Sequence, residues 1–138
     1  MIKVQKKNFD IEIEIDAIRK HNPEIGAVSF FIGYVRNFNN NKNVKFIELE
    51  VYEKMAYKSL EEISEKAKKK WDIVDTLIIH RFGKLDITEK IVLIATFSKH
   101  RKESHESCNF IMDYLKKEAP FWKKEIYKKN YEWLKNTK

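Results

Sequence analysis

The sequence contains few of the residues that build several common types of functional site. Its 138 residues include one cysteine, three glycines and two prolines. A single cysteine, Cys108, excludes a disulfide framework and a cysteine-based zinc site within one chain, and glycine is too scarce for a glycine-rich phosphate loop. No apolar run approaches the roughly 20 residues of a membrane-spanning helix, and the stretch MIKVQKKNFDIEIEI lacks the apolar core of a signal peptide. We therefore expect a cytoplasmic protein with a reduced thiol.

Apolar and positively charged residues are abundant instead. Hydrophobic residues make up 43% and aromatic residues 13% of the chain, and the length fits a single globular domain over residues 1–138. The formal net charge is +7, and residues 121–138 hold six lysines against two glutamates. This excess favours an anionic partner, which can be a nucleic acid, a phosphate compound or an acidic protein surface.

Most of the sequence patterns predict β-strands. Alternation of isoleucine and glutamate predicts a strand at residues 11–15, and the nearly continuous apolar run at 27–36 predicts a strand buried on both faces. Further strands are expected at residues 2–5 (at a sheet edge), 44–52, 74–85, 90–98 and 120–127. Residues 37–43 are expected to form a polar loop and residues 86–89 a turn.

Two long helices are predicted by their apolar spacing. From Lys54 to Trp71, apolar residues recur every three or four positions between charged ones, which is typical of an amphipathic helix. Residues 103–118 repeat the pattern, and Pro120 is expected to end that helix.

Two shorter helical segments complete the prediction. Residues 16–21 are expected to form a short helix with Asp16 as its N-cap, and residues 130–135 a helical turn. Together these elements predict an α+β fold in which two main helices pack on one side of a mixed or antiparallel sheet.

The stretch SKHRKESHE, residues 98–106, is the first candidate site, because it joins a predicted strand to a predicted helix. A helix N-terminus offers free N–H groups to an anion, and His100 and Arg101 add side-chain donors. An ordinary basic loop with a capping serine explains the same residues. His100 and His105 are not spaced to share one helix face, and no acidic cluster accompanies them. We therefore expect no metal site, and no pattern predicts a cofactor.

Three further cations are candidates for binding or catalysis. Arg36 ends a predicted strand, where a guanidinium can reach a phosphate or a carboxylate, although a surface ion pair is the alternative. Lys116 lies in the last turn of a predicted helix, and Lys123 follows beside the aromatic pair 121–122. A lysine between apolar walls and other cations can act as a nucleophile or general base, while surface lysines beside core aromatics are the alternative. We interpret His80 as structural.

Taken together, these segments resemble the MoaE family, the large, catalytic subunit of molybdopterin synthase. The resemblance runs from about residue 26 to residue 133 and is carried by GAVSFFIGYVRN, LEVYEKMA, IIHRFGKL, SKHR and, above all, FIMDYLKKEAPFWKKEIY. Each motif alone is weak, but their order and spacing together are specific. The turn at residues 87–89 departs from the family pattern, because it lacks the glycine often found there.

The resemblance implies an α/β hammerhead fold and an enzyme of molybdenum-cofactor biosynthesis. Such an enzyme converts cyclic pyranopterin monophosphate (precursor Z) to molybdopterin by installing two sulfurs as a dithiolene. The sulfur arrives as the C-terminal thiocarboxylate of a small ubiquitin-like subunit of the MoaD type. Members of the family form a homodimer with one small subunit at each end, which makes a heterotetramer.

Motif positions also imply the site residues. Lys116 and Lys123 are expected to be catalytic, with Lys116 closest to the thiocarboxylate carbon and Lys123 assisting as acid, base or electrostatic stabiliser. The substrate-binding residues implied by the resemblance are Arg36, His100, Arg101, Phe31 and Met112. In the family dimer, Arg36 or His100 is expected to serve the pocket of the neighbouring subunit.

The competing hypothesis is a non-enzymatic basic module that binds RNA through lysines and aromatic residues. The net charge and the aromatic pair 121–122 allow this function. The sequence contains no RNP-type aromatic motif, no GXXG loop and no helix with one continuous basic face, which favours the enzyme.

Overall fold

The computed structural model of the chain describes residues 1–39, 42–118, 120–127 and 131–134. The strands in this part of the chain are β1 Ile2–Gln5, β2 Ala27–Tyr34, β3 Phe38–Asn39, β4 Lys42–Asn43, β5 Phe46–Val51, β6 Ile73–Arg81, β7 Gly83–Asp86, β8 Lys90–Ser98, β9 Phe121–Ile126 and β10 Tyr131–Leu134. The helices are α1 Ile11–Arg19, α2 Glu53–Lys70 and α3 Arg101–Glu118. None of these helices is long and apolar enough to cross a membrane.

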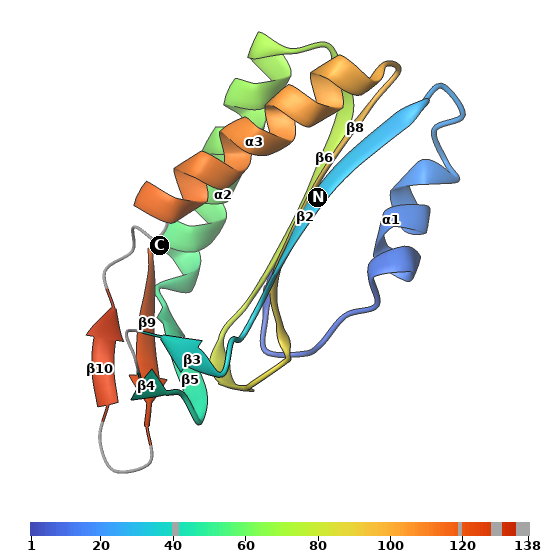
Figure 1. Cartoon of the computed structure of the whole chain (residues 1–138). Helices are drawn as coiled ribbons and strands as arrows, with labels where there is room; N and C mark the ends of the chain where they lie inside the picture. Colours follow the sequence, from blue (N-terminus) through green and yellow to red (C-terminus); the bar gives the residue numbers. More distant parts are fainter. Residues whose placement is uncertain (40–41, 119, 128–130, 135–138) are drawn as a thin grey trace.

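Two four-stranded sheets form the framework of the fold (Figure 1). The first has the strand order β1-β6-β8-β2, in which β1 runs parallel to β6 and the other pairs are antiparallel. The second has the order β10-β9-β5-β7 and is antiparallel throughout. The mixed sheet and the edge position of β1 confirm the α+β prediction.

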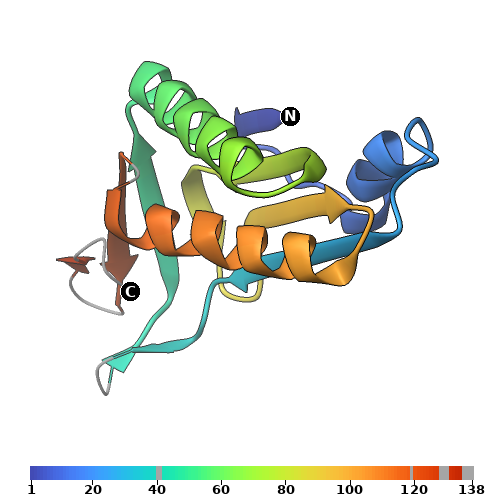
Figure 2. The same ribbon diagram turned by 90° about the horizontal axis from the view of Figure 1, so that it is seen from above.

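Helices cover both faces of the first sheet. Helices α2 and α3 lie side by side on one face (Figures 1 and 2), where Leu60, Ile78 and Ile111 belong to one core cluster. Burying each such side chain contributes about 2 kcal/mol. Helix α1 lies on the opposite face, and its Ile18 packs with Leu93 in a second cluster. The two main helices are on one side as predicted. The short helix expected at residues 16–21 overlaps α1, but its position on the other face of the sheet is not predicted.

The N-terminal helix corrects two predictions. Residues 11–15, predicted as a strand, form the start of α1, and Asp16, predicted as an N-cap, lies inside that helix. The actual N-cap is Asp10, whose Oδ1 accepts a hydrogen bond from the N–H of Ile13 at 2.9 Å. This bond satisfies one of the donors that the first turn leaves without a helical partner.

Strand β2 lies at the edge of the first sheet, so the prediction that it is buried on both faces is wrong. It pairs with β8 and is last in the strand order. Phe30, Phe31 and Tyr34 are 53%, 38% and 51% exposed. The apolar run therefore reflects an edge strand rich in aromatic residues, and not an interior strand.

Three other segments differ from their predictions. Residues 37–43, predicted as a loop, contain the paired short strands β3 and β4, with residues 40 and 41 outside the described part. The predicted strand at 74–85 divides at Phe82 between the two sheets. The predicted helical turn at 130–135 is wrong, because residues 131–134 form β10, which pairs with β9.

The turn between β7 and β8 holds an unusual backbone conformation. Thr88 has φ 73°, in the left-handed region that β-branched residues avoid. Its N–H donates to the carbonyl oxygen of Val35 at 2.8 Å, and the N–H of Val35 donates to the carbonyl oxygen of Glu89 at 3.0 Å. These bonds fix the chain just after β2, immediately before Arg36.

Cys108 is buried. Its side chain is 6% exposed, and burial raises the pKa of the thiol to about 11. The Sγ atom lies 3.9 Å from the carbonyl oxygen of Ile94. A thiol with this pKa is protonated at neutral pH and is therefore a poor nucleophile.

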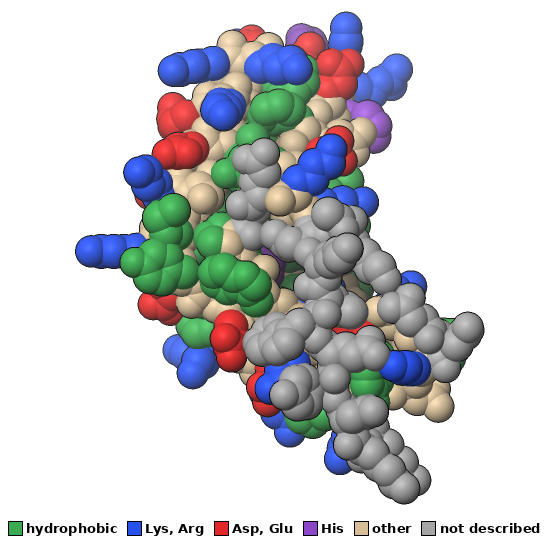
Figure 3. All heavy atoms as spheres, turned by 90° about the vertical axis from the view of Figure 1, so that its left-hand side faces the viewer, with side chains coloured by type: hydrophobic (Ala, Val, Ile, Leu, Met, Phe, Trp, Pro, Cys, Tyr) green, Lys and Arg blue, Asp and Glu red, His purple; other side chains and the backbone are tan. Residues whose placement is uncertain are grey.

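The surface charge is mixed on the face shown in Figure 3. Lys and Arg side chains lie among Asp and Glu, and a group of hydrophobic side chains is gathered between them. Large exposed apolar side chains include Tyr52, Met55 and Trp122. Among the described residues visible on this face, the positive charges are therefore distributed among negative ones and do not form a single basic stripe.

Candidate active site

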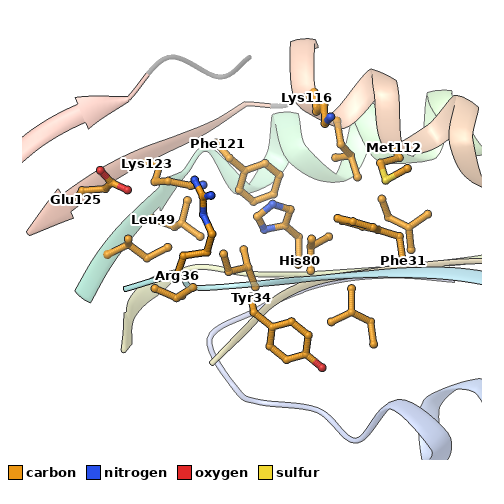
Figure 4. Close-up of a pocket in the computed structure, with 18 of the residues that line it drawn as sticks. Phe31, Tyr34, Arg36, Leu49, His80, Met112, Lys116, Phe121, Lys123 and Glu125 are labelled. Atoms are coloured by element: carbon orange, nitrogen blue, oxygen red, sulfur yellow. The ribbon is translucent and has the colours of Figure 1, made fainter. Parts of the chain in front are cut away.

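A pocket lies where the two sheets meet near the C-terminal end of α3 (Figure 4). Its volume is about 720 Å³. Strands of both sheets and helix α3 contribute to its wall. In the described lining, the cations Arg36, Lys116 and Lys123 face a single carboxylate, Glu125. The pocket therefore carries an excess of positive charge, which attracts and orients anions.

Lys116 and Lys123 are brought together by the end of a helix. Lys116 is exposed in the last turn of α3, where the partial negative charge of a helix C-terminus favours a cation. The chain then passes Pro120, which cannot continue a helix, and enters β9. Pairing of β9 with β5 sets Lys123 opposite Leu49. Both lysines consequently line the same pocket.

A buried hydrogen-bonded network stands behind Arg36. The carboxylate of Glu125, 6% exposed, accepts hydrogen bonds from Nδ2 of Asn39 at 3.0 and 3.2 Å and from the hydroxyl of Tyr127 at 2.7 Å. Nη2 of Arg36 in turn donates to Oδ1 of Asn39 at 3.5 Å. These donors offset the cost of burying the carboxylate, and the network links β3 to β9.

Phe31 and Met112 form an apolar part of the wall. Phe31 comes from β2 and Met112 from α3, and the two side chains lie next to each other in Figure 4. A Cβ at Gly33 would lie 3.1 Å from Cγ1 of Val92 and 3.7 Å from the ring of Phe31. A side chain at position 33 would therefore crowd Val92, whereas its contact with the phenyl ring of Phe31 would be an ordinary one.

His80 enters the pocket from β6. Its ring stacks on Phe121, with centroids 3.6 Å apart and 15° between the planes. Its Nδ1 lies 2.8 Å from the carbonyl oxygen of Arg81, which can only accept, so the proton is on Nδ1 and the lone pair on Nε2. Burial lowers the pKa of His80 to about 4, the bond to Arg81 opposes this shift, and the charge of Lys123 adds to it. The ring is therefore neutral at pH 7.

His100 and Arg101 lie away from this pocket. Arg101 begins α3, fifteen residues before Lys116, which corresponds to about 22 Å along a helix axis. Both side chains are exposed, and neither is part of the pocket wall. Within one chain the structure thus brings together Phe31, Arg36, Met112, Lys116 and Lys123, but not the pair at the start of α3.

Three polar residues of the pocket are not predicted as site residues from the sequence. His80 is interpreted there as structural, Asn39 falls in a predicted loop, and Glu125 stands among lysines. One usable signal exists for Glu125. It lies two residues after Lys123 in a segment predicted to be extended, so the two side chains share one face of the strand.

The fold and the pocket define a class: an α+β protein with a cationic pocket, walled by apolar and aromatic side chains, that suits a small anionic ligand.

Comparisons with known proteins identify the family. The family model described as MoaE protein matches residues 4–118. The chain is 49% identical over 133 residues to the molybdopterin synthase catalytic subunit of Ralstonia nicotianae, covering 96% of this chain and 76% of that relative. The solved molybdopterin biosynthesis MoaE protein from Burkholderia ambifaria is 41% identical with a TM-score of 0.86, covering 100% of this chain and 90% of that one. The chain belongs to the MoaE family.

A more distant structure shows the same fold. It is a protein-protein complex of subunits 1 and 2 of molybdopterin-converting factor from Helicobacter pylori, with a TM-score of 0.81 and 23% identity. The match covers 97% of this chain and 90% of that one. The likenesses confirm the fold class that the sequence motifs imply.

Proposed function

We propose that this protein is a molybdopterin synthase catalytic subunit, a sulfurtransferase that converts cyclic pyranopterin monophosphate to molybdopterin. The observation that carries the proposal is the pocket of about 720 Å³ at which Arg36, Lys116 and Lys123 converge in a chain of the MoaE family. The cyclic phosphate of the substrate is anionic, so converging cations bind and orient it. Phe31 and Met112 supply the apolar wall against which a flat pterin ring packs.

The sulfur donor in this proposal is the C-terminal thiocarboxylate of a small ubiquitin-like subunit of the MoaD type. A thiocarboxylate is anionic, and it must reach the same cationic pocket as the pterin. The state of Cys108 supports an external donor. Its thiol is buried and has a pKa of about 11, so it is unsuited to carry reactive sulfur.

In our proposal the two lysines, Lys116 and Lys123, have different roles in catalysis. Lys116 lies closest to the thiocarboxylate carbon and stabilises the negative charge that develops there as sulfur is transferred. Lys123, on the neighbouring strand, assists as acid, base or electrostatic stabiliser. Arg36 holds the phosphate while the substrate ring opens. Preorganised cations of this kind act where the charge forms, without the reorganisation that water requires.

We further propose a homodimer that joins two copies along the exposed edge of β2. In a symmetric antiparallel pairing, the Ala27 end of one β2 lies beside the Tyr34 end of the other. The N–H of Gly26 donates to the carbonyl oxygen of Ser98 at 2.9 Å. The Ala27 end of β2 is therefore close to the start of α3, which follows Ser98 by three residues.

This pairing explains the position of the two remaining candidate residues. His100 and Arg101 would approach the pocket of the neighbouring subunit, next to Arg36, and add two donors to it. With one small subunit for each pocket, the complete enzyme is a heterotetramer.

The first prediction is a single-turnover test. The purified chain is mixed with thiocarboxylated small subunit and precursor Z, and molybdopterin is measured as its fluorescent oxidised derivative. We expect product from the wild type and a loss of rate of about 100-fold or more in Lys116→Ala, the size expected for one lost charge-stabilising donor. Lys117→Ala is the matched control, because Lys117 is exposed in the same helical turn and is not part of the pocket wall.

The outcomes separate the reaction from the residue. Product from the wild type and from Lys116→Ala at similar rates would keep the enzyme and reject the role of Lys116. No product from the wild type, with the small subunit demonstrably bound, would reject the proposed reaction.

RNA binding is the second candidate function, favoured by the net charge of +7. It predicts tight binding to generic RNA that weakens steeply with salt. The mixed charge of the described residues on the face in Figure 3 and the gathering of cations inside a pocket argue for the small-molecule enzyme. Weak RNA binding together with tight binding of the small subunit is the result that we expect.

A further inference from the structure

We propose that His80 is a specificity-determining residue of the pocket, whose Nε2 accepts a hydrogen bond from an N–H group of the pterin ring. The inference rests on the proposed function and deepens it. Arg36, Lys116 and Lys123 recognise the anionic groups of the ligands, whereas His80 recognises the donor edge of the heterocycle.

The orientation of the imidazole is fixed on three sides. Its strand, β6, is held between β1 and β8, with His80 opposite Val4 and Val92. One face of the ring stacks on Phe121 at 3.6 Å. The remaining rotation is fixed by the bond from Nδ1 to the carbonyl oxygen of Arg81 at 2.8 Å. A ring held in this way presents Nε2 in one direction, as a preorganised binding group does.

In our proposal the pocket lies in that direction. His80 belongs to the pocket wall, and Figure 4 shows its ring beneath Phe121, in the space between Arg36 and Lys116. Because Nδ1 donates to a carbonyl oxygen, Nε2 carries the lone pair and acts as an acceptor. The carboxylate in the described lining does not duplicate this role. Glu125, the acidic residue of the described lining, is already bound by Asn39 and Tyr127.

Burial, and to a smaller extent the charge of Lys123, lowers the pKa of His80 and keeps the ring an acceptor. Lys123 faces it from β9, Lys116 from α3, and Arg36 from the segment after β2. An imidazolium among these cations is unfavourable, and burial lowers the pKa of His80 to about 4. The ring is thus neutral wherever the enzyme works near neutral pH. Reduced pterins carry ring N–H and amino groups, which are the donors that such an acceptor selects.

Two polar substitutions separate the two ring nitrogens. In His80→Asn, the amide reaches the position of Nδ1 and can still donate to the Arg81 carbonyl, but the pocket acceptor is lost. In His80→Gln, the longer side chain places its carbonyl oxygen near the position of Nε2 and keeps the acceptor. His80→Phe keeps the stacking on Phe121 and removes both nitrogens. His21→Asn is the control, because His21 is exposed just after α1.

The measurement is the affinity for precursor Z, by titration calorimetry, together with KM and kcat in the complete complex. We expect His80→Asn and His80→Phe to weaken binding about tenfold, the effect of one lost hydrogen bond to a buried acceptor, with a matching rise in KM and little change in kcat. His80→Gln should recover most of the affinity, and His21→Asn should equal the wild type. Unchanged affinity in His80→Asn, with the wild type binding normally, would overturn this inference alone.

A second readout does not depend on how the variants fold. Nitrogen-15 NMR of the histidines in the wild type should show a neutral His80 with its proton on Nδ1, and precursor Z should shift the Nε2 resonance. A proton on Nε2, or no shift at saturating substrate, would refute the assignment. Failure of the wild type to bind precursor Z at all would instead reject the proposed function.

Discussion

A buried neutral histidine leaves a signature in the stability of the protein. His80 has a pKa of about 4 in the folded chain, against an ordinary value of 6.5. Between these two values the unfolded chain binds a proton that the folded chain does not. The free energy of unfolding therefore falls as the pH drops from about 6.5 to about 4. Above that range, the contribution of His80 to the free energy of unfolding is constant.

We predict that this contribution amounts to as much as about 3 kcal/mol. Urea denaturation of the wild type and of His80→Asn, at about pH 7 and about pH 4.5, measures it. The variant should lose less stability between the two conditions, because its side chain does not titrate. The same loss in both proteins would show that His80 titrates normally in the folded chain.

At the scale of single residues, only part of the candidate site can be predicted from the sequence. Lys116, Lys123 and Arg36 stand in recognisable motifs, so their convergence on one pocket could be predicted. Asn39 and Glu125 are 86 positions apart, and nothing local to either residue indicates their contact. The role of the Arg81 carbonyl in orienting His80 is likewise a product of the folded backbone.

At the scale of elements, the segment 11–15 shows why alternation alone is a weak signal. Isoleucines at positions 11, 13 and 15 fit a strand, but those at 11, 15 and 18 also lie on one face of a helix. In the structure this face packs against the first sheet, while Ile13 is 68% exposed. The sequence signal that favours a helix here is Asp10, because aspartate is a preferred N-cap residue. Helix α2 was predicted within one residue at each end, because its spacing fits only one period.

The turn before β8 yields a prediction about stability. Thr88 has φ 73°, a conformation that costs a residue with a Cβ about 1 to 2 kcal/mol. Thr88→Gly keeps the N–H that bonds to Val35 and removes the steric cost. We expect a gain of about 1 kcal/mol, after allowing for the greater flexibility of glycine in the unfolded chain.

Thermal or urea denaturation tests this expectation against a neighbouring control. Ile87→Gly should lower stability, because Ile87 is not in the left-handed region and gains nothing from a missing Cβ. A destabilised Thr88→Gly would mean that contacts of the threonine side chain outweigh the backbone strain.

At the scale of the whole molecule, the pocket depends on the junction of two sheets and, in the proposed dimer, on a second copy of the chain. Each sheet contributes cations or apolar walls, and α3 spans the distance between the pocket and the pair His100 and Arg101. A sequence can indicate that a helix of this length exists. The helix pattern itself does not indicate that the two ends serve different pockets. That arrangement is implied only by the family resemblance, and in our proposal it depends on the open edge of β2.

We predict that Phe30→Glu converts the proposed homodimer to a monomer with an intact fold. Phe30 is 53% exposed on the edge strand, so a charge there is tolerated by the single chain but not between two paired strands. Light scattering after gel filtration measures the mass, and turnover should fall because His100 and Arg101 no longer reach a neighbouring pocket. Ile13→Glu, at a 68% exposed position on α1, is the control and should stay dimeric. A dimeric Phe30→Glu would exclude β2 as the interface.

The burial of Cys108 has a consequence for the economy of sulfur in the cell. A chain whose single cysteine is a protonated, enclosed thiol cannot keep a persulfide between turnovers. On the proposed function the protein transfers sulfur but does not store it. Each molybdopterin uses the sulfur of two thiocarboxylated small subunits, which leave without sulfur and must receive it again from another enzyme. Under sulfur starvation the output of such an enzyme stops with its carrier supply, however much enzyme is present.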